Sequence, residues 1–507
     1  MAGIAALCLA ACAVGPDYRK PAVQVPQSFK EGADWQRAQA NPQASLASDW
    51  WRVYHDDKLT ELIEQSQKAN QSIAASEAAY RVAQAIVQAN TASLFPVISA
   101  GLSGTRSGTG SGAASRGSAA SLTGTSLPGV SNSFVASAAA TWELDLWGAF
   151  RRQIEAAKGN AEASDAQLAG QRLSIAASVA TDYFLLRQAD VDIELLKQQQ
   201  DVDTRILDMT RAAFQQGQAS SDQVLFAQDT LEAVVANLQA SEASREQDEH
   251  AIAVLLGVPP ANFSIAPDPH YAFLEPEVPL GVPSQLLERR YDVVAAERTA
   301  ASSNALIGAA EAAFFPTVTL SAQGGFQHNT IANLFSLPNR FWTLGPDIAE
   351  TIFDGGARTA AVREARATYD QNVALYRNTV LTAFQNVEDS LSSVNHLRQQ
   401  SKSFEDILQR NQQLFASERA QFDVGSASQQ DLLTQQLTLL LAEQNLSDTQ
   451  ALLTQSSVTL IRNLGGGWDW NDVQTADAGN AHAPEAGTSK PQETATPPPQ
   501  GAAATPQ

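Results

Sequence analysis

The sequence has few residues that commonly form metal or catalytic sites. Its two cysteines, Cys8 and Cys12, both lie in the first dozen residues, so the body of the chain has no disulfide and no thiolate metal site. The six histidines are scattered without the spacing of a metal-binding pair, and we expect them to be solvated or hydrogen-bonded. No metal and no other cofactor is predicted. No set of residues has the pattern of a catalytic site, so we do not expect an enzyme.

Positive charge and long apolar runs are also scarce. The chain has 33 Lys and Arg residues against 54 Asp and Glu residues, a net charge of −21. Binding to nucleic acid depends on basic residues that displace counterions from phosphates, so DNA and RNA are excluded as partners. After the amino-terminal segment no run of 18 apolar residues occurs, which excludes a membrane-spanning helix. Aromatic residues are 7% and charged residues 17% of the chain, which favours long helices over a compact enzyme core.

The amino terminus has the pattern of a secretory leader. Residues 4–11 form a short apolar run that ends in Leu9-Ala10-Ala11-Cys12, a spacing that resembles the bacterial lipobox. Residues 1–11 are therefore predicted to be a signal peptide and Cys12 to be lipid-modified; the alternative is a chance cysteine in an alanine-rich leader. Ala13 is not Asp, which by the rule for such lipoproteins favours the outer membrane. No Lys or Arg precedes the apolar run, so we expect the true start to lie upstream.

An internal repeat organises the chain. The segment from Arg211 to Ser220 recurs at residues 419–428, a displacement of 208 residues (419 − 211). The same displacement relates Gly257 to Gly465. Upstream, the Phe-Pro pair at residue 95 recurs at residue 315, a displacement of 220, so the first copy carries 12 extra residues. These fall in the Gly/Ser-rich stretch 101–131, which is predicted to form an enlarged loop.

Each copy predicts two strands followed by helices. Residues 317–322 alternate polar and apolar side chains, as do residues 98–102, which is typical of half-buried strands. Returning strands are predicted over residues 136–146 and about 341–353. Beyond Gly148 and Gly356 the period becomes helical. Valine then recurs every seven residues, which is typical of a coiled-coil seam, at residues 373, 380, 387 and 394.

Helix lengths indicate the architecture. Residues 151–215 and 357–421 predict two long helices of about 97 Å each at 1.5 Å per residue. Two shorter helices are expected to stack end to end along each long one. The predicted short helices span residues 59–94, 219–256, 284–313 and 427–464. A soluble coiled-coil rod is the alternative, but it leaves the four strands unexplained.

The four strands predict an oligomer. Four strands cannot close a barrel, and an open sheet edge cannot lie in lipid, so several chains must pool their strands. Three chains would supply twelve strands, a suitable number for a closed barrel. The predicted fold class is thus an α+β membrane protein with a trimeric β-barrel, long helices and two internal repeats. The resemblance described below implies that the helices form a barrel continuous with the β-barrel.

Several short motifs occur in a fixed order between Cys12 and Trp468. They are Gly15-Pro16-Asp17-Tyr18, Asp49-Trp50-Trp51, Leu144-Asp145-Leu146-Trp147-Gly148, Leu255-Leu256-Gly257, Ile307-Gly308, Phe315-Pro316, Phe353-Asp354-Gly355-Gly356 and the two repeated turn segments. In this order, and with the duplication, the sequence resembles the TolC superfamily, specifically the NodT-type lipoproteins of resistance-nodulation-division efflux systems. Tyr291 departs from the family pattern Arg-Pro-Asp, so the turn there is expected to differ.

The resemblance implies a function and an assembly. It implies a homotrimeric exit duct with a twelve-stranded outer-membrane barrel, a twelve-helix periplasmic tunnel and a mixed α/β equatorial domain. The implied partners are a periplasmic adaptor, an inner-membrane pump of the resistance-nodulation-division type and outer-membrane lipid. The predicted segments are a signal peptide (1–11), a lipidated equatorial segment (12–58), repeat 1 (59–257), an equatorial linker (258–283), repeat 2 (284–468) and an equatorial end with a disordered tail (469–507).

The two repeated turns are the candidate docking site for the adaptor. A reversal between long helices needs a residue that tolerates positive φ, and a serine that follows can cap the return helix. Arginine in the last turn of the incoming helix would be favoured by the helix dipole. The alternative is that these are only fold residues of tight turns. The eight candidates are Arg211, Phe214, Gly217, Ser220, Arg419, Phe422, Gly425 and Ser428.

The idle gate is expected just past these turns. The family often places an Asp ring there, but this sequence has Phe226 and Thr434 at those positions. Gln430 and Asp431 are the nearest polar substitutes, unless they face outwards. The excess of Asp and Glu over Lys and Arg predicts a negative electrostatic potential in the lumen, which would favour the passage of cations, unless these charges lie on the outer faces of the helices.

Two other functions stay open. The duct could serve a type I protein-secretion system, or the chain could be a scaffold without a transport role. The lipobox and motifs favour efflux, because secretion ducts of the family commonly lack the lipid. The exported substrate is not encoded in the sequence.

Overall fold

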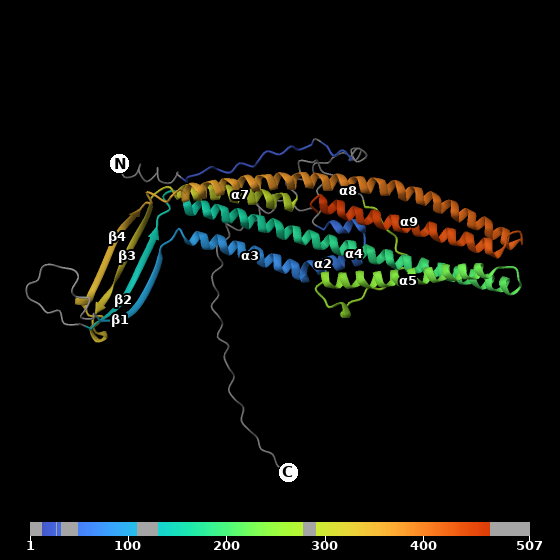
Figure 1. The fold of residues 1–507 in the computed structure, drawn as a ribbon, viewed down its shortest axis with the longest axis horizontal. Helices are drawn as coiled ribbons and strands as arrows, with labels where there is room; N and C mark the ends of the chain where they lie inside the picture. Colours follow the sequence, from blue (N-terminus) through green and yellow to red (C-terminus); the bar gives the residue numbers. More distant parts are fainter. Residues whose placement is uncertain (1–12, 27, 32–48, 109–129, 277–289, 467–507) are drawn as a thin grey trace, which may run out of the picture.

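The computed structural model describes residues 13–26, 28–31, 49–108, 130–276 and 290–466. In Figure 1 a four-stranded sheet lies at one end of an elongated molecule, and helices run from it to the other end. Among the described residues, no helix is both long and apolar enough to cross a membrane. The predicted signal peptide, Cys12 and the carboxyl-terminal tail lie outside the described residues.

Two helices of equal length form the frame of the molecule. Helix α4 (Ala149–Gln215) and helix α8 (Ala357–Asp423) have 67 residues each, or about 100 Å at 1.5 Å per residue. Both begin after a glycine in the left-handed region, Gly148 at φ 83° and Gly356 at φ 93°. The prediction of one long helix in each repeat is confirmed.

Shorter helices pack end to end along the long ones, as predicted. In repeat 1, α2 (Asp57–Ala69), α3 (Gln71–Ala92) and α5 (Ser221–Leu255) contact α4. In repeat 2, α7 (Tyr291–Ala312) and α9 (Gln429–Asn463) contact α8. Helix α4 also contacts α7 and α9, so the two repeats share one body (Figure 1).

Two predicted helices differ in the structure. Residues 59–94 do not form one helix, because Asn70 ends α2 and caps α3. Its side-chain oxygen accepts from the amides of Ser72 and Ile73, and its amide nitrogen donates to the carbonyl of Leu255 at 2.8 Å. Helix α7 begins at Tyr291, after the extended Arg290, whose guanidinium binds the Asp292 carboxylate. Residues 284–289 of this predicted helix lie outside the described residues.

The four strands form one antiparallel sheet in the order β1-β2-β3-β4. They are β1 (Val97–Gly108), β2 (Val130–Glu143), β3 (Thr317–His328) and β4 (Arg340–Ala349). The predicted loop of residues 101–131 is wrong at both ends, because β1 continues to Gly108 and β2 already begins at Val130; residues 109–129 lie outside the described residues. The returning strands also end before the predicted Leu146 and Phe353.

Residues of the motifs at 144–148 and 315–316 join the sheet to the helices. The ring of Trp147 stacks on Phe315 at 4.7 Å between centroids, and its indole nitrogen donates to the carbonyl of Pro316. The Asp145 carboxylate accepts from the amides of Phe150 and Arg151 at the start of α4. These contacts fix the angle between β-sheet and helix at the junction.

The core lies in the middle of the helical body. The valines of the predicted coiled-coil seam, residues 373, 380, 387 and 394, are all buried, and the last three belong to the main core cluster, which confirms the seam. Four 3₁₀ helices complete the described elements: η2 (Trp50–Tyr54), η3 (Pro260–Asn262), η4 (Ile331–Asn333) and η5 (Leu337–Asn339).

Candidate functional site

The sheet has one apolar and one polar face. Cross-strand partners share a face, and one row runs Ile98, Ala140, Ala322 and Leu344. On the same face the large side chains Leu102, Trp142, Leu320, Trp342 and Ile348 are exposed. The opposite face carries Ser, Thr, Gln and Gly residues, for example in the pairs Ser99 with Ala139 and Ser321 with Gly345.

This sheet lacks partners at both edges within the described chain, where β1 and β4 each pair on one side only. Its apolar face lies uncovered at the end of the molecule (Figure 1). A large exposed apolar surface marks a contact with lipid or protein. The alternation of apolar and polar side chains along each strand therefore fits a sheet with lipid on one face and water on the other.

The two predicted tip turns lie together at the far end of the helices, opposite the sheet (Figure 1). Gly217 has φ 75° and Gly425 has φ 77°, which confirms the need for residues that tolerate positive φ. A Cβ at either position would meet no atom within 4 Å, so backbone conformation and not crowding requires glycine. The turns close with bonds from the amides of Gln218 and Ser426 to carbonyls five residues earlier.

Both serines cap the return helices as predicted. The Ser220 hydroxyl accepts from the amide of Gln223, whose side chain accepts from the Ser220 amide, a capping box. Ser428 forms the same box with Asp431. Helices α5 and α9 therefore begin just after these serines, two residues later than predicted.

The arginine prediction is wrong in its position. Neither α4 nor α8 has a basic residue in its last turn, because both helices extend four residues past Arg211 and Arg419. The guanidinium nitrogen of Arg211 lies 3.8 Å from the carboxylate oxygen of Asp208, and both side chains are exposed. Phe214 and Phe422 are exposed at the tips, together with Val424. Exposed aromatic rings beside well-defined turns are suited to protein contact.

The gate candidates lie on the first two turns of the return helices. Phe226 on α5 is exposed, as are Gln430, Asp431 and Thr434 on α9. The Asp431 carboxylate accepts hydrogen bonds from the hydroxyl and amide of Ser428, which lower its pKa. Asp431 thus has a capping role, and it stays ionised at neutral pH. Its role as a gate stays a prediction.

The segment that follows Cys12 is held at the junction of sheet and helices. The amide of Val14 donates to the carbonyl of Trp147, and Gly15 lies so close to Gly308 that a Cβ would be 2.3 Å from its Cα. The buried Arg152 guanidinium donates to the carbonyls of Val14 and Gly15. We call residues 13–26 the strap. The lipid on Cys12 stays a prediction, but the next residue is fixed beside the sheet.

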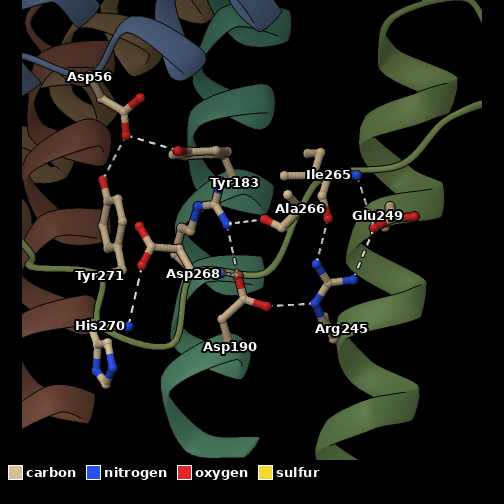
Figure 2. A network of polar contacts seen from close by, with 11 residues as sticks. Asp56, Tyr183, Asp190, Arg245, Glu249, Ile265, Ala266, Asp268, His270 and Tyr271 are labelled. Atoms are coloured by element: carbon tan, nitrogen blue, oxygen red, sulfur yellow. Dashed lines mark hydrogen bonds and ion pairs between the residues drawn. The ribbon is translucent and has the colours of Figure 1, made fainter. Parts of the chain in front are cut away.

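A polar network holds the described part of the predicted equatorial linker (Figure 2). The carboxylate of Asp190 binds Arg187 at 2.8 Å and Arg245 at 2.6 Å. Arg187 donates to the carbonyl of Ala266, and Arg245 donates to the carbonyl of Ile265. Both α4 and α5 therefore bind the linker. The hydroxyls of Tyr183 and Tyr271 donate to Asp56 beside it.

The sequence did not single out these network residues. Arginines and aspartates spaced three or four apart are common on solvated helix faces, so Arg187 and Asp190 gave no distinct signal. Their burial depends on the linker, which is remote in sequence. The Gly15-Pro16-Asp17-Tyr18 motif indicated that the strap is important, but no motif indicated Arg152, which binds it.

Comparison with known proteins gives the same fold. A family model described as "Outer membrane efflux protein" matches residues 62–258 and 282–466. The chain is 29% identical over 484 residues to the probable efflux pump outer membrane protein TtgC of Pseudomonas putida, covering 95% of this chain and 98% of the relative.

Solved structures are similar over most of the chain. The outer-membrane channel OprN is 28% identical with a TM-score of 0.78, over 90% of this chain and 100% of that one. The Campylobacter jejuni outer membrane channel CmeC has a TM-score of 0.82 at 23% identity, over 92% of this chain and 98% of that one, and it supports the fold alone.

Proposed function

Because this chain belongs to the outer membrane efflux protein family, we propose that it is the exit duct of a tripartite efflux pump and exports small molecules across the outer membrane. The predicted kinship with TolC-like channels is confirmed by the family match and the related channels. A duct performs no bond chemistry; it offers a water-filled path and opens when its partners dock.

The observation that carries the proposal is the uncovered sheet at the end of a helical body of about 100 Å. Its apolar face suits lipid and its polar face suits water. Since its two edges need partners, three chains would close a barrel of twelve strands. The long and stacked helices of three chains would form the twelve-helix tunnel below it, in the periplasm.

Conductance of the purified full chain in planar lipid bilayers tests this function. We expect discrete current steps, because a closed barrel with a polar interior conducts ions. A scaffold without a transport role would give none. Deletion of the gene should also sensitise cells to small toxic compounds. Loss of a secreted protein with unchanged resistance would favour a type I secretion duct instead.

We assign the segments as the sequence predicted, with repeat 1 at 59–257 and repeat 2 at 284–468. The segments 12–58, 258–283 and the start of 469–507 then form the equatorial domain. The network of Asp190, Arg187 and Arg245 supports this assignment, because it fixes the linker against the middle of α4 and α5.

The chain is anchored by lipid at Cys12 in this proposal. The strap supports the anchor, because it places Ala13 beside the junction where the sheet enters the membrane: a Cβ on Gly148 would lie 2.8 Å from Ala13. Several acyl chains contribute about 0.8 kcal/mol per buried methylene, which is enough for stable anchoring. Cys12→Ser should abolish palmitate labelling of the mature protein. Labelling that persists would contradict lipidation at Cys12.

The six tips of a trimer are the proposed docking surface for a periplasmic adaptor. Each chain contributes two similar turns, whose glycine conformations and capping boxes are the same in both repeats. The adaptor connects the duct to an inner-membrane pump, which we take to be of the resistance-nodulation-division type.

A further inference from the structure

Two carboxyl groups from different repeats meet between α4 and α9. The side-chain amide of Gln188 on α4 donates to the Asp448 carboxylate of α9 at 2.8 Å, and Asp192 lies four residues further along the same face of α4, beside Asp448. Oδ1 of Asp192 is buried and has no hydrogen-bond partner. Two neighbouring, partly buried carboxylates repel each other when both are ionised, so a proton on one of them favours the contact between α4 and α9.

The surrounding charged groups do not relieve this repulsion. On α4, Arg187 is engaged by Asp190, two residues before Asp192 and so on a different helix face. From α5, Arg245 is bound to Asp190 and Glu249. Glu194 accepts a bond from Gln198, and Lys197 is exposed.

On α9, Glu443 adds a further acidic group, and burial raises its pKa. The charged group that acts on Asp192 is Asp448. Burial and this neighbour raise the pKa of Asp192 to about 7, and burial also raises the pKa of Asp448. The pair therefore titrates near neutral pH, where exposed aspartates are already ionised.

We propose that Asp192 and Asp448 form a proton-dependent latch between the two repeats, which holds α9 against α4 when the pair shares a proton and loosens when both groups are ionised. The loosening releases one proton per chain to solvent. Nearer to the tip turns, α4 and α9 also contact each other through an apolar cluster of Val202, Leu433 and Leu440. The two helices therefore separate only if this cluster also opens. Where it concerns opening of the duct, the latch rests on the proposed function.

The direction of the pH effect follows from the pKa values. With the latch closed, the Asp192 pKa is about 7, and with the helices apart it returns towards its ordinary value of 3.8. The closed form therefore binds more protons between these values. As pH rises through this window, the ratio of open to closed latch increases by up to about tenfold per unit for each chain, and it levels off above about pH 7.

The experiment uses the full chain and two readouts. Asp192→Asn and Asp448→Asn each keep the size and polarity of the side chain but remove the charge from one member of the pair. Asp201→Asn is the matched control, because Asp201 lies on the same helix but is exposed and paired with Arg205. The first readout is hydrogen exchange of α4 and α9 in detergent at about pH 5 and pH 8, comparing variants with wild type at the same pH. The second is open probability in planar bilayers.

We expect faster exchange in the wild type than in either Asn variant at pH 8 and equal exchange at pH 5, with the control equal to wild type at both. Open probability should rise with pH in the wild type and in the control only. Equal exchange of wild type and Asn variants at both pH values overturns the latch, even if no current is seen. A pH response of the current that persists in the double Asn variant also overturns it. Absence of current at every pH, with the expected exchange, contradicts the duct and leaves the latch supported.

Discussion

Arg152 is a buried cation that binds two backbone carbonyls of the strap and two carboxylates. Its guanidinium donates to Val14 and Gly15, and it also binds the carboxylates of Asp17 and Glu155. Asp17 is exposed, so its ion pair contributes little, and the bonds to buried carbonyls dominate. Arg152 thus holds the first residues of the strap at the point where α4 begins.

Arg152→Ala should release the strap. The loss of charge-assisted bonds to buried carbonyls costs roughly 2–3 kcal/mol locally. Limited proteolysis with mass spectrometry should then show cleavage between residues 13 and 26 that is absent in the wild type. Arg172→Ala serves as the control, because Arg172 forms an exposed pair with Glu77. An uncleaved strap in Arg152→Ala would mean that Asn304 and Tyr18 suffice to hold it.

Asp182 gives a second pH-dependent prediction, here for stability. Burial, then the nearby Asp248, raise its pKa to about 6. The folded chain therefore binds a proton that the unfolded chain has lost between pH 3.8 and about 6, and stability falls as pH rises through this window. Asp182→Asn should raise the melting temperature at pH 8 by the equivalent of about 1 kcal/mol, after allowance for solvent screening, and not at pH 4. A gain of equal size at both values would contradict ionisation as the cause.

The helices and strands were predictable because their periodicity is long and regular. The 67-residue helices and the alternation of the strands followed from patterns that span many turns or pairs. The break at Asn70 was not predictable, because its neighbours are helix formers and its partner carbonyl belongs to Leu255, far along the chain. The same holds for the latch, since Asp192 and Asp448 are separated by 256 residues (448 − 192).

The candidate tip was predictable in its local chemistry. The positive φ of the glycines and the helix capping by the serines each depend on only a few consecutive residues. Both features can therefore be predicted from the local sequence. The prediction failed for Arg211 although the helix end at Gln215 was predicted correctly, because Arg211 lies four residues before that end and so just outside the last turn. Whether the turns bind an adaptor depends on a second protein, which no pattern in this chain encodes.

Proline at the tip glycines tests docking. Gly217→Pro and Gly425→Pro cannot keep φ near 75°, because proline fixes φ near −65°. We expect a normal trimer and barrel but loss of adaptor cross-linking and of drug resistance. Ser221→Pro and Gln429→Pro are the controls, since they place proline at the first helical position, where it is tolerated. Wild-type cross-linking by both glycine variants would place the docking site elsewhere on the tunnel.

The whole chain is one third of the proposed assembly. A trimer of chains of 53.9 kDa should be the stable species in detergent, because only pooled strands satisfy the edges of β1 and β4. Native mass spectrometry or light scattering measures this directly. A detergent-stable monomer that conducts current would rule out the pooled barrel.

The unpaired edges of β1 and β4 also determine how such a duct can be made. In the proposed trimer, a single chain would expose backbone amides and carbonyls to hydrocarbon if it entered the bilayer alone, so the proposal implies that insertion and assembly of the three chains are simultaneous. The rate of barrel formation then depends steeply on the local concentration of newly exported chains. An unassembled chain exposes unpaired strand edges that can pair with the strands of other proteins. Such a chain needs a carrier or a membrane tether until its two partner chains bind.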